Sequence, residues 1–235
     1  MCTYNSIIVD AKKLASRYKR EVEPYQPTFR ANAYAHPEFP IVLIDSVKTF
    51  LWGLIPSWIH NVDYAKELAD DTINVRAETI YDKPELIKIV ESKRCIIPST
   101  GFFEWRSNNN FKHPYYLKVK DQEIFSIAGV YQSWKNPTTG SIVNTFSMLT
   151  LEGNDMIKYI HTASNRIPLI LSPEEEEMWL KPRLTKYEIL SLMKVIPSSK
   201  LQAYAVSLDL LNLSPNDPDA IKPIGNIIDG VYLKK

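Results

Sequence analysis

The second residue of the chain is a cysteine, and this position gives it chemistry that no internal residue has. Removal of Met1, which is usual before a small residue, would leave Cys2 with a free α-amine beside its thiol. The pKa of an α-amine is about 7.7–8.0, against about 10.4 for a lysine, so this amine is partly neutral near physiological pH. A neutral amine attacks an aldehyde to form an imine, and the adjacent thiol can then close a five-membered thiazolidine ring. The alternative is an incidental cysteine close to a frayed terminus.

Three polar residues alternate along the segment 73–79, which reads Ile-Asn-Val-Arg-Ala-Glu-Thr. In an extended segment Asn74, Arg76 and Glu78 share one face, because side chains alternate with period two. An amide, a guanidinium and a carboxylate resist burial without partners, so this face is a candidate anion site in which Arg76 grips a phosphate bidentately. A surface strand that carries a salt bridge explains the pattern equally well.

A carboxylate and a histidine could supply proton transfer. Glu104 lies within the aromatic run Phe102-Phe103-Glu104-Trp105, where loss of solvent would raise its pKa toward the range that a general acid/base needs. The alternation of a strand also allows Glu104 to face water instead. His161 lies five residues before Arg166 and the apolar segment that follows it, although a lone histidine is more often structural than catalytic. Cys95, the other cysteine, is expected to pack as a small hydrophobe.

Two tryptophans flank the turn-prone segment Gly53-Leu54-Ile55-Pro56. Exposed aromatic side chains at such a turn could stack on unpaired bases, at roughly 1–3 kcal/mol per base. Packing in the core is the alternative, and it suits Trp52 better than Trp58.

Strands and helices that would position these residues can be read from the apolar pattern and from capping signals. We expect helices over residues 10–20 (with Asp10 as N-cap), 62–68, 84–91, 173–180 and 186–193. We expect strands over residues 41–44, 49–52, 94–97, 115–119, 124–130, 143–151 and 167–171, with a turn at Gly140. Strands follow one another instead of alternating with helices, which predicts an α+β domain with a mixed, largely antiparallel sheet and not a doubly wound fold.

The composition restricts the class of protein. The chain has 235 residues, a net charge of +1, 45% hydrophobic residues, two cysteines and seven glycines. We therefore expect one domain spanning residues 1–235, with neither a disulfide framework nor a zinc site, no cofactor-binding glycine motif and no membrane span. Cysteine usage of this kind indicates a reducing, cytoplasmic location. A basic cluster around Lys13, Arg17 and Arg20 is expected to be a solvated helix face, with a DNA contact as the less favoured alternative. The acidic run at 174–177 would offset its charge.

Five motifs, taken in order, resemble the SRAP (SOS response-associated peptidase) family. They are Met-Cys at the start, Trp-Gly-Leu-Ile-Pro-x-Trp, Asn-x-Arg-x-Glu-Thr, Arg-Cys-Ile-Ile-Pro-x-x-Gly-Phe-x-Glu-Trp, and Ile-His followed by Arg-Ile-Pro. The resemblance extends to the late Val206-Ser207 and to the Asn-Asp-Pro at 216–218. It implies a compact domain whose barrel-like, largely antiparallel sheet is flanked by helices.

The resemblance also implies a function. Cys2, freed of Met1, would cross-link to the ring-opened sugar of an abasic site in single-stranded DNA and shield the lesion as a thiazolidine. The implied roles are catalysis by Cys2, Asn74, Glu104 and His161: Asn74 positions Cys2, Glu104 shuttles protons, and His161 assists ring opening and imine formation. DNA contacts are implied for Arg76, Trp58, Ile59 and Arg166. We also expect Trp52 to contact DNA, because it lies next to the turn at 53–56.

Three departures from the family pattern concern the predicted DNA contacts. The common Met-Cys-Gly-Arg opening is Met-Cys-Thr-Tyr here, so an arginine contact to phosphate is missing and Tyr4 is a candidate for stacking instead. The spacing between His161 and Arg166 is longer than the common His-x-Arg. A tandem tryptophan of some members is Trp58-Ile59 here.

Two other functions fit the same residues. The first is an N-terminal-nucleophile cysteine peptidase that acts on polypeptides, and the second is a non-covalent binder of single-stranded DNA. The expected partner is single-stranded DNA containing abasic sites, bound by a monomer that needs neither cofactor nor metal and associates with the nucleoid when on DNA.

Overall fold

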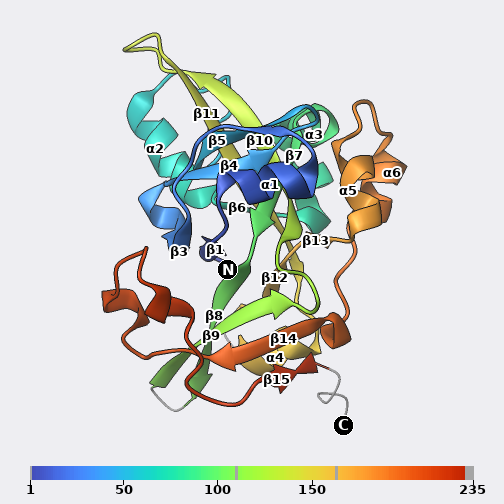
Figure 1. Ribbon diagram of the computed structural model, residues 1–235. Coiled ribbons are helices and arrows are strands. Elements are labelled where there is room, and N and C mark those ends of the chain that lie inside the picture. Colours follow the sequence, from blue (N-terminus) through green and yellow to red (C-terminus); the bar gives the residue numbers. More distant parts are fainter. Residues whose placement is uncertain (1, 109–110, 162–163, 231–235) are drawn as a thin grey trace.

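A closed ring of strands forms the larger part of the fold in the computed structural model, which describes residues 2–108, 111–161 and 164–230 (Figure 1). The ring contains β4 (Glu38–Val42), β5 (Ser46–Trp52), β7 (Arg94–Ser99), β10 (Phe125–Lys135) and β11 (Ile142–Glu152). The pairs β11–β10, β10–β7, β7–β4 and β4–β5 are antiparallel, and the parallel pair β5–β11 closes the ring. This is the mixed, largely antiparallel barrel that the sequence predicts.

Four short strands pair with strands of the barrel. β6 (Asn74–Arg76) runs parallel to β11, and β12 (Arg166–Pro168) pairs antiparallel with the same strand. On the outside, β13 (Ile170–Leu171) pairs with β10, and β2 (Glu21–Val22) pairs with β5. Both β6 and β12 pair with the end of β11, where Arg76 lies opposite Thr150 and Arg166 lies opposite Glu152.

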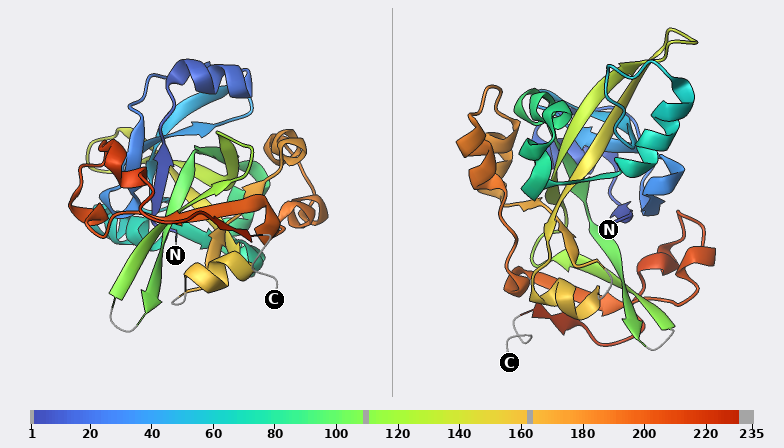
Figure 2. Two further views of the ribbon diagram at one scale, coloured as in Figure 1. Left: turned by 60° about the horizontal axis from the view of Figure 1, so that its bottom comes forward. Right: turned by 180° about the vertical axis from the view of Figure 1, so that it is seen from behind.

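A second sheet lies below the barrel in Figure 1. Its strand order is β15 (Ile228–Asp229), β14 (Leu201–Ala205), β9 (Phe111–Val119), β8 (Gly101–Asn108), β1 (Tyr4–Ile7) and β3 (Thr28–Asn32). Strand β1 starts close to the junction of this sheet with the barrel (Figures 1 and 2). The first described residue, Cys2, is buried there.

Helices cover the outside of both sheets. The α-helices are α1 (Ala11–Tyr18), α2 (Val62–Asp71), α3 (Pro84–Ser92), α4 (Asp155–Ile160), α5 (Pro173–Leu180) and α6 (Lys186–Leu192). Short 3₁₀ helices are η1 (Ala33–Ala35), η2 (Ala77–Asp82), η3 (Ser198–Lys200), η4 (Leu210–Asn212) and η5 (Pro218–Ile221). The fold is a single compact α+β arrangement, as the succession of strands predicts.

Most of the predicted elements are confirmed, with small shifts at their ends. Asp10 caps α1 by accepting from the backbone of Lys13 at 2.8 Å, and α5 begins and ends where it was expected. The sequence reading missed α4 and the strands β1, β3 and β14. These elements are short, and their burial comes from tertiary neighbours more than from a periodic pattern.

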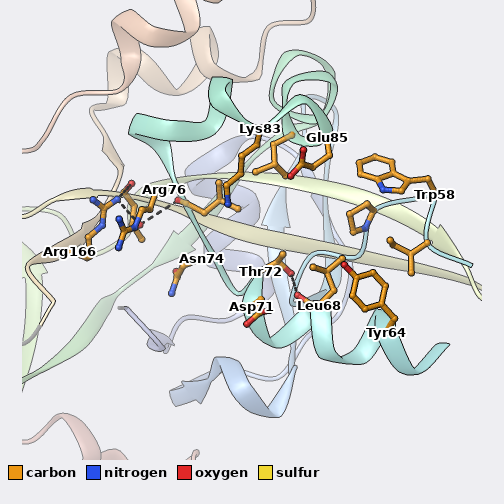
Figure 3. Close-up of a pocket in the computed structure, with 15 residues that line it drawn as sticks. Trp58, Tyr64, Leu68, Asp71, Thr72, Asn74, Arg76, Lys83, Glu85 and Arg166 are labelled. Atoms are coloured by element: carbon orange, nitrogen blue, oxygen red, sulfur yellow. Dashed lines mark hydrogen bonds between the residues drawn. The ribbon is translucent and has the colours of Figure 1, made fainter. Parts of the chain in front are cut away.

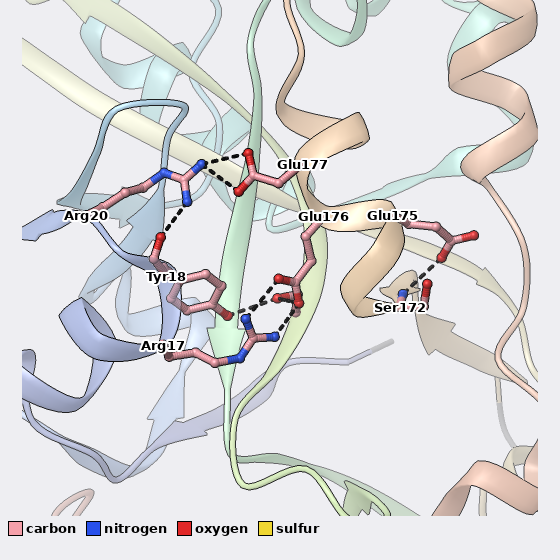
Figure 4. A network of polar contacts seen from close by, with 8 residues as sticks. Arg17, Tyr18, Arg20, Ser172, Glu175, Glu176 and Glu177 are labelled. Carbon is pink, nitrogen blue, oxygen red and sulfur yellow. Dashed lines mark hydrogen bonds and ion pairs between the residues drawn. The ribbon is translucent and has the colours of Figure 1, made fainter.

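The basic and acidic clusters of the sequence pair with each other. Arg17 on α1 and Glu176 on α5 form a bidentate ion pair, and Arg20 pairs with Glu177 (Figure 4). Glu176 also accepts a hydrogen bond from Ser126 of β10 at 2.7 Å, so α1 and α5 contact each other and the barrel strand β10 through one carboxylate. The basic cluster therefore holds two helices together, which argues against a DNA contact there.

Candidate functional site

Cys2 lies at the junction of the two sheets, although a residue next to a chain terminus is usually mobile. Its side chain is 1% exposed and belongs to the main hydrophobic core. Strand β1, which begins at Tyr4, is held on both sides, by β3 and by β8, and this pairing fixes the start of the chain.

Two acceptors face the Cys2 thiol. Its Sγ donates to Glu104 Oε1 at 2.8 Å, and the backbone carbonyl of Arg166 lies 3.7 Å away. Burial, followed by the charge of Glu104 and its hydrogen bond, raises the pKa of the Cys2 thiol well above its usual range. The thiol is therefore protonated in this state, and its proton is directed at a carboxylate.

Glu104 connects the thiol to His161. Its second oxygen, Oε2, lies 2.7 Å from Nδ1 of His161, and the Glu104 and His161 residues are 1% and 8% exposed. Glu104 thus contacts the Cys2 thiol through one oxygen and the His161 ring through the other. The alternative in which Glu104 faces water is wrong. Cys2, Glu104 and His161 form a continuous chain of polar contacts.

The alternation along β8 explains why Glu104 points inward. Phe102 packs in the main core with Cys2. Phe103 and Trp105 pack in a second cluster, against residues 206–221, which we call the C-terminal segment. Glu104 thus shares the Cys2 side of the strand with Phe102. His161 arrives from the end of α4, where it is the C-cap and its backbone N–H donates to Ile157.

Asn74 fixes the backbone of Cys2. Its Nδ2 donates to the Cys2 carbonyl at 2.8 Å from its position on β6, opposite Met148 of β11. The Asn74 Oδ1 is buried without a hydrogen-bond partner among the described residues. A buried acceptor of this kind costs free energy unless a donor arrives, and the amine of a processed Cys2 is one candidate donor.

The polar face predicted for 73–79 is only partly confirmed. Asn74 and Arg76 lie on β6, but Glu78 lies in η2, because the strand ends after three residues. Glu78 forms a bidentate ion pair with Arg166, with both N–O distances at 2.8 Å. Burial alone would raise the pKa of Glu78, but hydrogen bonds from Arg166 and from backbone amides lower it.

Arg166 is held inside the protein. Besides Glu78, its Nη2 donates to the Thr150 carbonyl at 2.6 Å, and the residue is 9% exposed. Both terminal nitrogens are therefore engaged by the protein itself, and Nε is buried without a partner among the described residues. The phosphate contact predicted for Arg166 stays a prediction, and the geometry favours a structural role.

A groove of about 570 Å³ runs from Asn74 toward Trp58 (Figure 3). Arg76, which is exposed, and Lys83 line it near the site, and Trp58 and Tyr64 are 44% and 52% exposed at the far end. The remaining lining residues are Pro56, Ile59, Leu68, Asp71, Thr72, Val75, Glu85, Leu86, Thr150 and Arg166. Cations near the nucleophile and aromatic rings farther out suit a flexible anion that carries flat apolar groups.

The groove contains side chains that the sequence reading missed. Tyr64 and Lys83 come from α2 and from the residue before α3, and no local pattern shows which face of a helix borders a groove. Ile59 lines the groove and packs against Trp134, whose Nε1 donates to the Ile59 carbonyl at 2.6 Å. This bond ties the Trp58 loop to the long β10–β11 hairpin.

The prediction of Trp52 as a DNA contact is wrong. Trp52 is 0% exposed and stacks on Phe146 at a centroid distance of 5.7 Å. Its Nε1 donates to the Ile73 carbonyl at 2.8 Å, so the polar atom is satisfied within the core. Trp52 closes the barrel next to β6 and cannot reach a base. Cys95 is also fully buried, as expected for a small hydrophobe.

The described residues show neither a metal-binding cluster nor a membrane-spanning helix. Within residues 2–108, 111–161 and 164–230, no group of three or more histidines, cysteines and acids is placed to hold a metal ion. In the same ranges, no helix is long and apolar enough to cross a membrane.

Comparisons with known proteins identify the family of this chain. The sequence model of the family "SOS response associated peptidase (SRAP)" matches residues 1–213. The abasic site processing protein YoqW of Bacillus subtilis (strain 168) is 36% identical over 173 residues, which cover 73% of this chain and 74% of the relative. The abasic site processing protein HMCES of Gallus gallus is 26% identical over 194 residues, with coverage of 74% and 56%.

Solved structures show the same fold. A protein from Bacteroides thetaiotaomicron superimposes with a TM-score of 0.92 at 42% identity, covering 94% of this chain and 99% of the other. A Bordetella bronchiseptica protein at 20% identity, with a TM-score of 0.76 and coverage of 88% and 100%, supports the fold alone. With the family match spanning nearly the whole sequence, the chain belongs to the SRAP family.

Proposed function

We propose that this protein processes abasic sites in DNA, and that it does so by forming a covalent bond between Cys2 and the lesion in a single strand. The observation that carries the proposal is the buried chain from the Cys2 thiol through Glu104 to His161, at 2.8 Å and 2.7 Å. The relatives named abasic site processing proteins support the substrate class.

The first step requires a free amine. In the full-length chain the Cys2 nitrogen is part of the peptide bond to Met1, and an amide nitrogen is not a nucleophile. After hydrolysis of that bond, the neutral amine attacks the C1′ aldehyde of the ring-opened sugar, and the resulting carbinolamine loses one water to give an imine. His161 and Glu104 move the protons of ring opening and water loss.

The second step closes the ring. Cys2 Sγ adds to the imine carbon, and the thiol proton passes to the imine nitrogen by way of Glu104, which already accepts it at 2.8 Å. The balance is one aldehyde and one aminothiol giving one thiazolidine and one water.

The surrounding residues orient the two reactants. Asn74 holds the Cys2 carbonyl, so the amine and thiol are fixed relative to Glu104. Arg76 supplies a charge for a phosphate, and Trp58 is exposed for packing against a base, with Ile59 beside it. Stacking needs an unpaired base, which favours a single strand. Arg166 acts instead by aligning β12 and η2.

The test is adduct formation with single-stranded DNA that contains one abasic site. The processed protein, with loss of Met1 verified by intact mass, should give a heat-stable adduct that Cys2→Ala abolishes. Cys2→Ser keeps the amine and loses the sulfur, so it should give an imine that borohydride traps but that heat reverses.

Other outcomes identify the rival functions. Turnover of a peptide library without DNA would instead indicate a cysteine peptidase. Tight binding without any adduct, unaffected by Cys2→Ala, would indicate a non-covalent binder. Complete absence of an adduct with a verified free amine would overturn the proposal. We also propose that the protein acts as a monomer, which light scattering with and without DNA would test.

A further inference from the structure

A second hollow opens on the other side of the catalytic residues. It has a volume of about 270 Å³ and is lined by Thr3, Tyr4, Glu104, Trp105, Ser107, Lys112, His161 and Leu211. We call it the Tyr4 hollow. Glu104 and His161 belong to its wall, whereas Asn74 and Arg166 belong to the wall of the groove that leads to Trp58. The catalytic residues therefore lie between two separate openings.

The wall of the Tyr4 hollow is mainly aromatic and apolar. Tyr4 and Trp105 pack at a centroid distance of 5.1 Å with their planes tilted by 55°. Both rings are half-buried against the cluster of Phe103 and the C-terminal segment, so each contributes part of its surface to the hollow. Leu211, from the same segment, is 56% exposed at its edge.

Two cations accompany the ring pair. Arg30 lies over the Tyr4 ring at 5.5 Å and is 6% exposed, and its Nη2 donates to the Leu213 carbonyl at 2.7 Å. This contact fixes the Tyr4 ring and the segment that carries Leu211. Lys112, on β9, is exposed and borders the hollow, where it can reach a phosphate.

The size and chemistry of the hollow restrict its ligand. A volume of about 270 Å³ lies just below the ~300–1,000 Å³ of typical ligand pockets, so it suits one flat group and not a longer stretch of strand. Half-buried aromatic rings with a neighbouring cation suit an unpaired nucleobase and its phosphate. A strand held at Cys2 must continue in two directions, and the groove toward Trp58 serves only one of them.

We propose that the Tyr4 hollow binds the unpaired nucleobase next to the abasic nucleotide, on the side of the strand that faces away from Trp58. The base packs against Tyr4, Trp105 and Leu211, and its phosphate lies near Lys112. This inference rests on the proposed function, because it takes single-stranded DNA as the ligand.

The test measures binding without cross-linking. Three oligonucleotides carry a tetrahydrofuran analogue of the abasic site, which has no aldehyde, in the middle, at the 5′ end or at the 3′ end. Fluorescence anisotropy gives the Kd of each for the processed wild-type protein, Tyr4→Leu, Tyr4→Phe and a control, Tyr187→Leu. Tyr187 is 84% exposed on α6, outside both openings.

The proposal predicts a dependence on one flank. Tyr4→Leu should weaken binding about 5-fold or more for the oligonucleotide with the internal analogue and for one of the two with a terminal analogue. The other terminal oligonucleotide lacks the nucleotide that would occupy the hollow, so its Kd should be unchanged. Tyr4→Phe, which keeps the ring, and Tyr187→Leu should match the wild type throughout. Equal loss on all three oligonucleotides, or loss on none, overturns the proposal. The analogue cannot form an adduct, so failure of Cys2 chemistry is detected separately with natural abasic DNA.

Discussion

Replacing Arg166 with methionine tests whether its guanidinium binds DNA or holds the protein together. In the structure both terminal nitrogens are occupied by Glu78 and Thr150, at distances of 2.6–2.8 Å. Methionine preserves much of the side-chain length and removes the charge. We expect no loss of a phosphate contact and a slower cross-linking step, because the bonds to Glu78 and Thr150 hold Arg166 in place, and its carbonyl faces the Cys2 thiol.

The salt dependence of binding separates the two roles. For single-stranded DNA, each phosphate contact contributes about −0.7 to the slope of log K against log salt concentration. Between 50 and 200 mM salt, a variant that has lost one phosphate contact should therefore lose roughly 2.5-fold less affinity than the wild type loses. Arg76→Met should lower the slope by about 0.7, because Arg76 is exposed in the groove, and Arg166→Met should leave it unchanged.

The assay is anisotropy at four or more salt concentrations with the unreactive analogue, followed by single-turnover cross-linking at saturating protein. Arg166→Met should slow cross-linking about 10-fold or more, since small displacements of reacting groups are costly. Glu78→Gln is the matched variant: it frees the guanidinium, so binding should stay as tight or tighten while cross-linking slows. A slope change for Arg166→Met equal to that for Arg76→Met would refute the structural role.

Three further predictions concern single residues. Asn74→Ala should slow cross-linking at saturating protein by more than it raises the Kd, because the amide contacts Cys2 and not the strand. Trp134→Phe, which removes the bond to the Ile59 carbonyl, should weaken binding of the analogue a few-fold and leave the cross-linking rate at saturation unchanged. Burial raises the pKa of the Cys95 thiol, so above about pH 8.5 the unfolded chain releases a proton that the folded chain keeps, and stability falls as pH rises. Cys95→Ala should therefore reduce the alkaline loss of unfolding free energy, followed by urea titration, by about 1 kcal/mol per pH unit between pH 9 and 10, and an unchanged slope would contradict the assignment.

Much of the fold was predictable because its signals are local. Pro84 and Pro173 mark the first turns of α3 and α5, and Asp10 caps α1. The alternation of side chains along a strand predicted that Phe102 and Glu104 share one side of β8, and the structure shows that this side faces Cys2. Closure of the barrel by the parallel β5–β11 pair has no local signal, since it joins segments about ninety residues apart.

The partners of charged groups were less predictable than their positions. Period-two alternation put Glu78 beside Arg76, but η2 begins at Ala77 and turns the carboxylate toward Arg166, 88 residues away. Trp52 and Trp58 flank the same turn, yet one closes the core and the other borders a groove. Sequence alone gives the residue types of such a site, whereas tertiary pairing decides which charges remain available to a ligand.

On the proposed mechanism, burial of Cys2 makes a residue next to the chain terminus a specific nucleophile. A free aminothiol on a mobile terminus would react with any aldehyde that it met, since its amine is partly neutral near pH 7.5. In the chain that retains Met1, Cys2 is 1% exposed, burial and Glu104 raise the pKa of its thiol, and the thiol donates a hydrogen bond to Glu104. On the proposed mechanism, the aldehyde reaches Cys2 between the groove and the Tyr4 hollow. A strand that occupies both openings can deliver its aldehyde there, whereas a free sugar gains nothing from Arg76 or Tyr4. Selectivity for the lesion then comes from the flanking nucleotides, and the intrinsic reactivity of Cys2 is kept low until they bind.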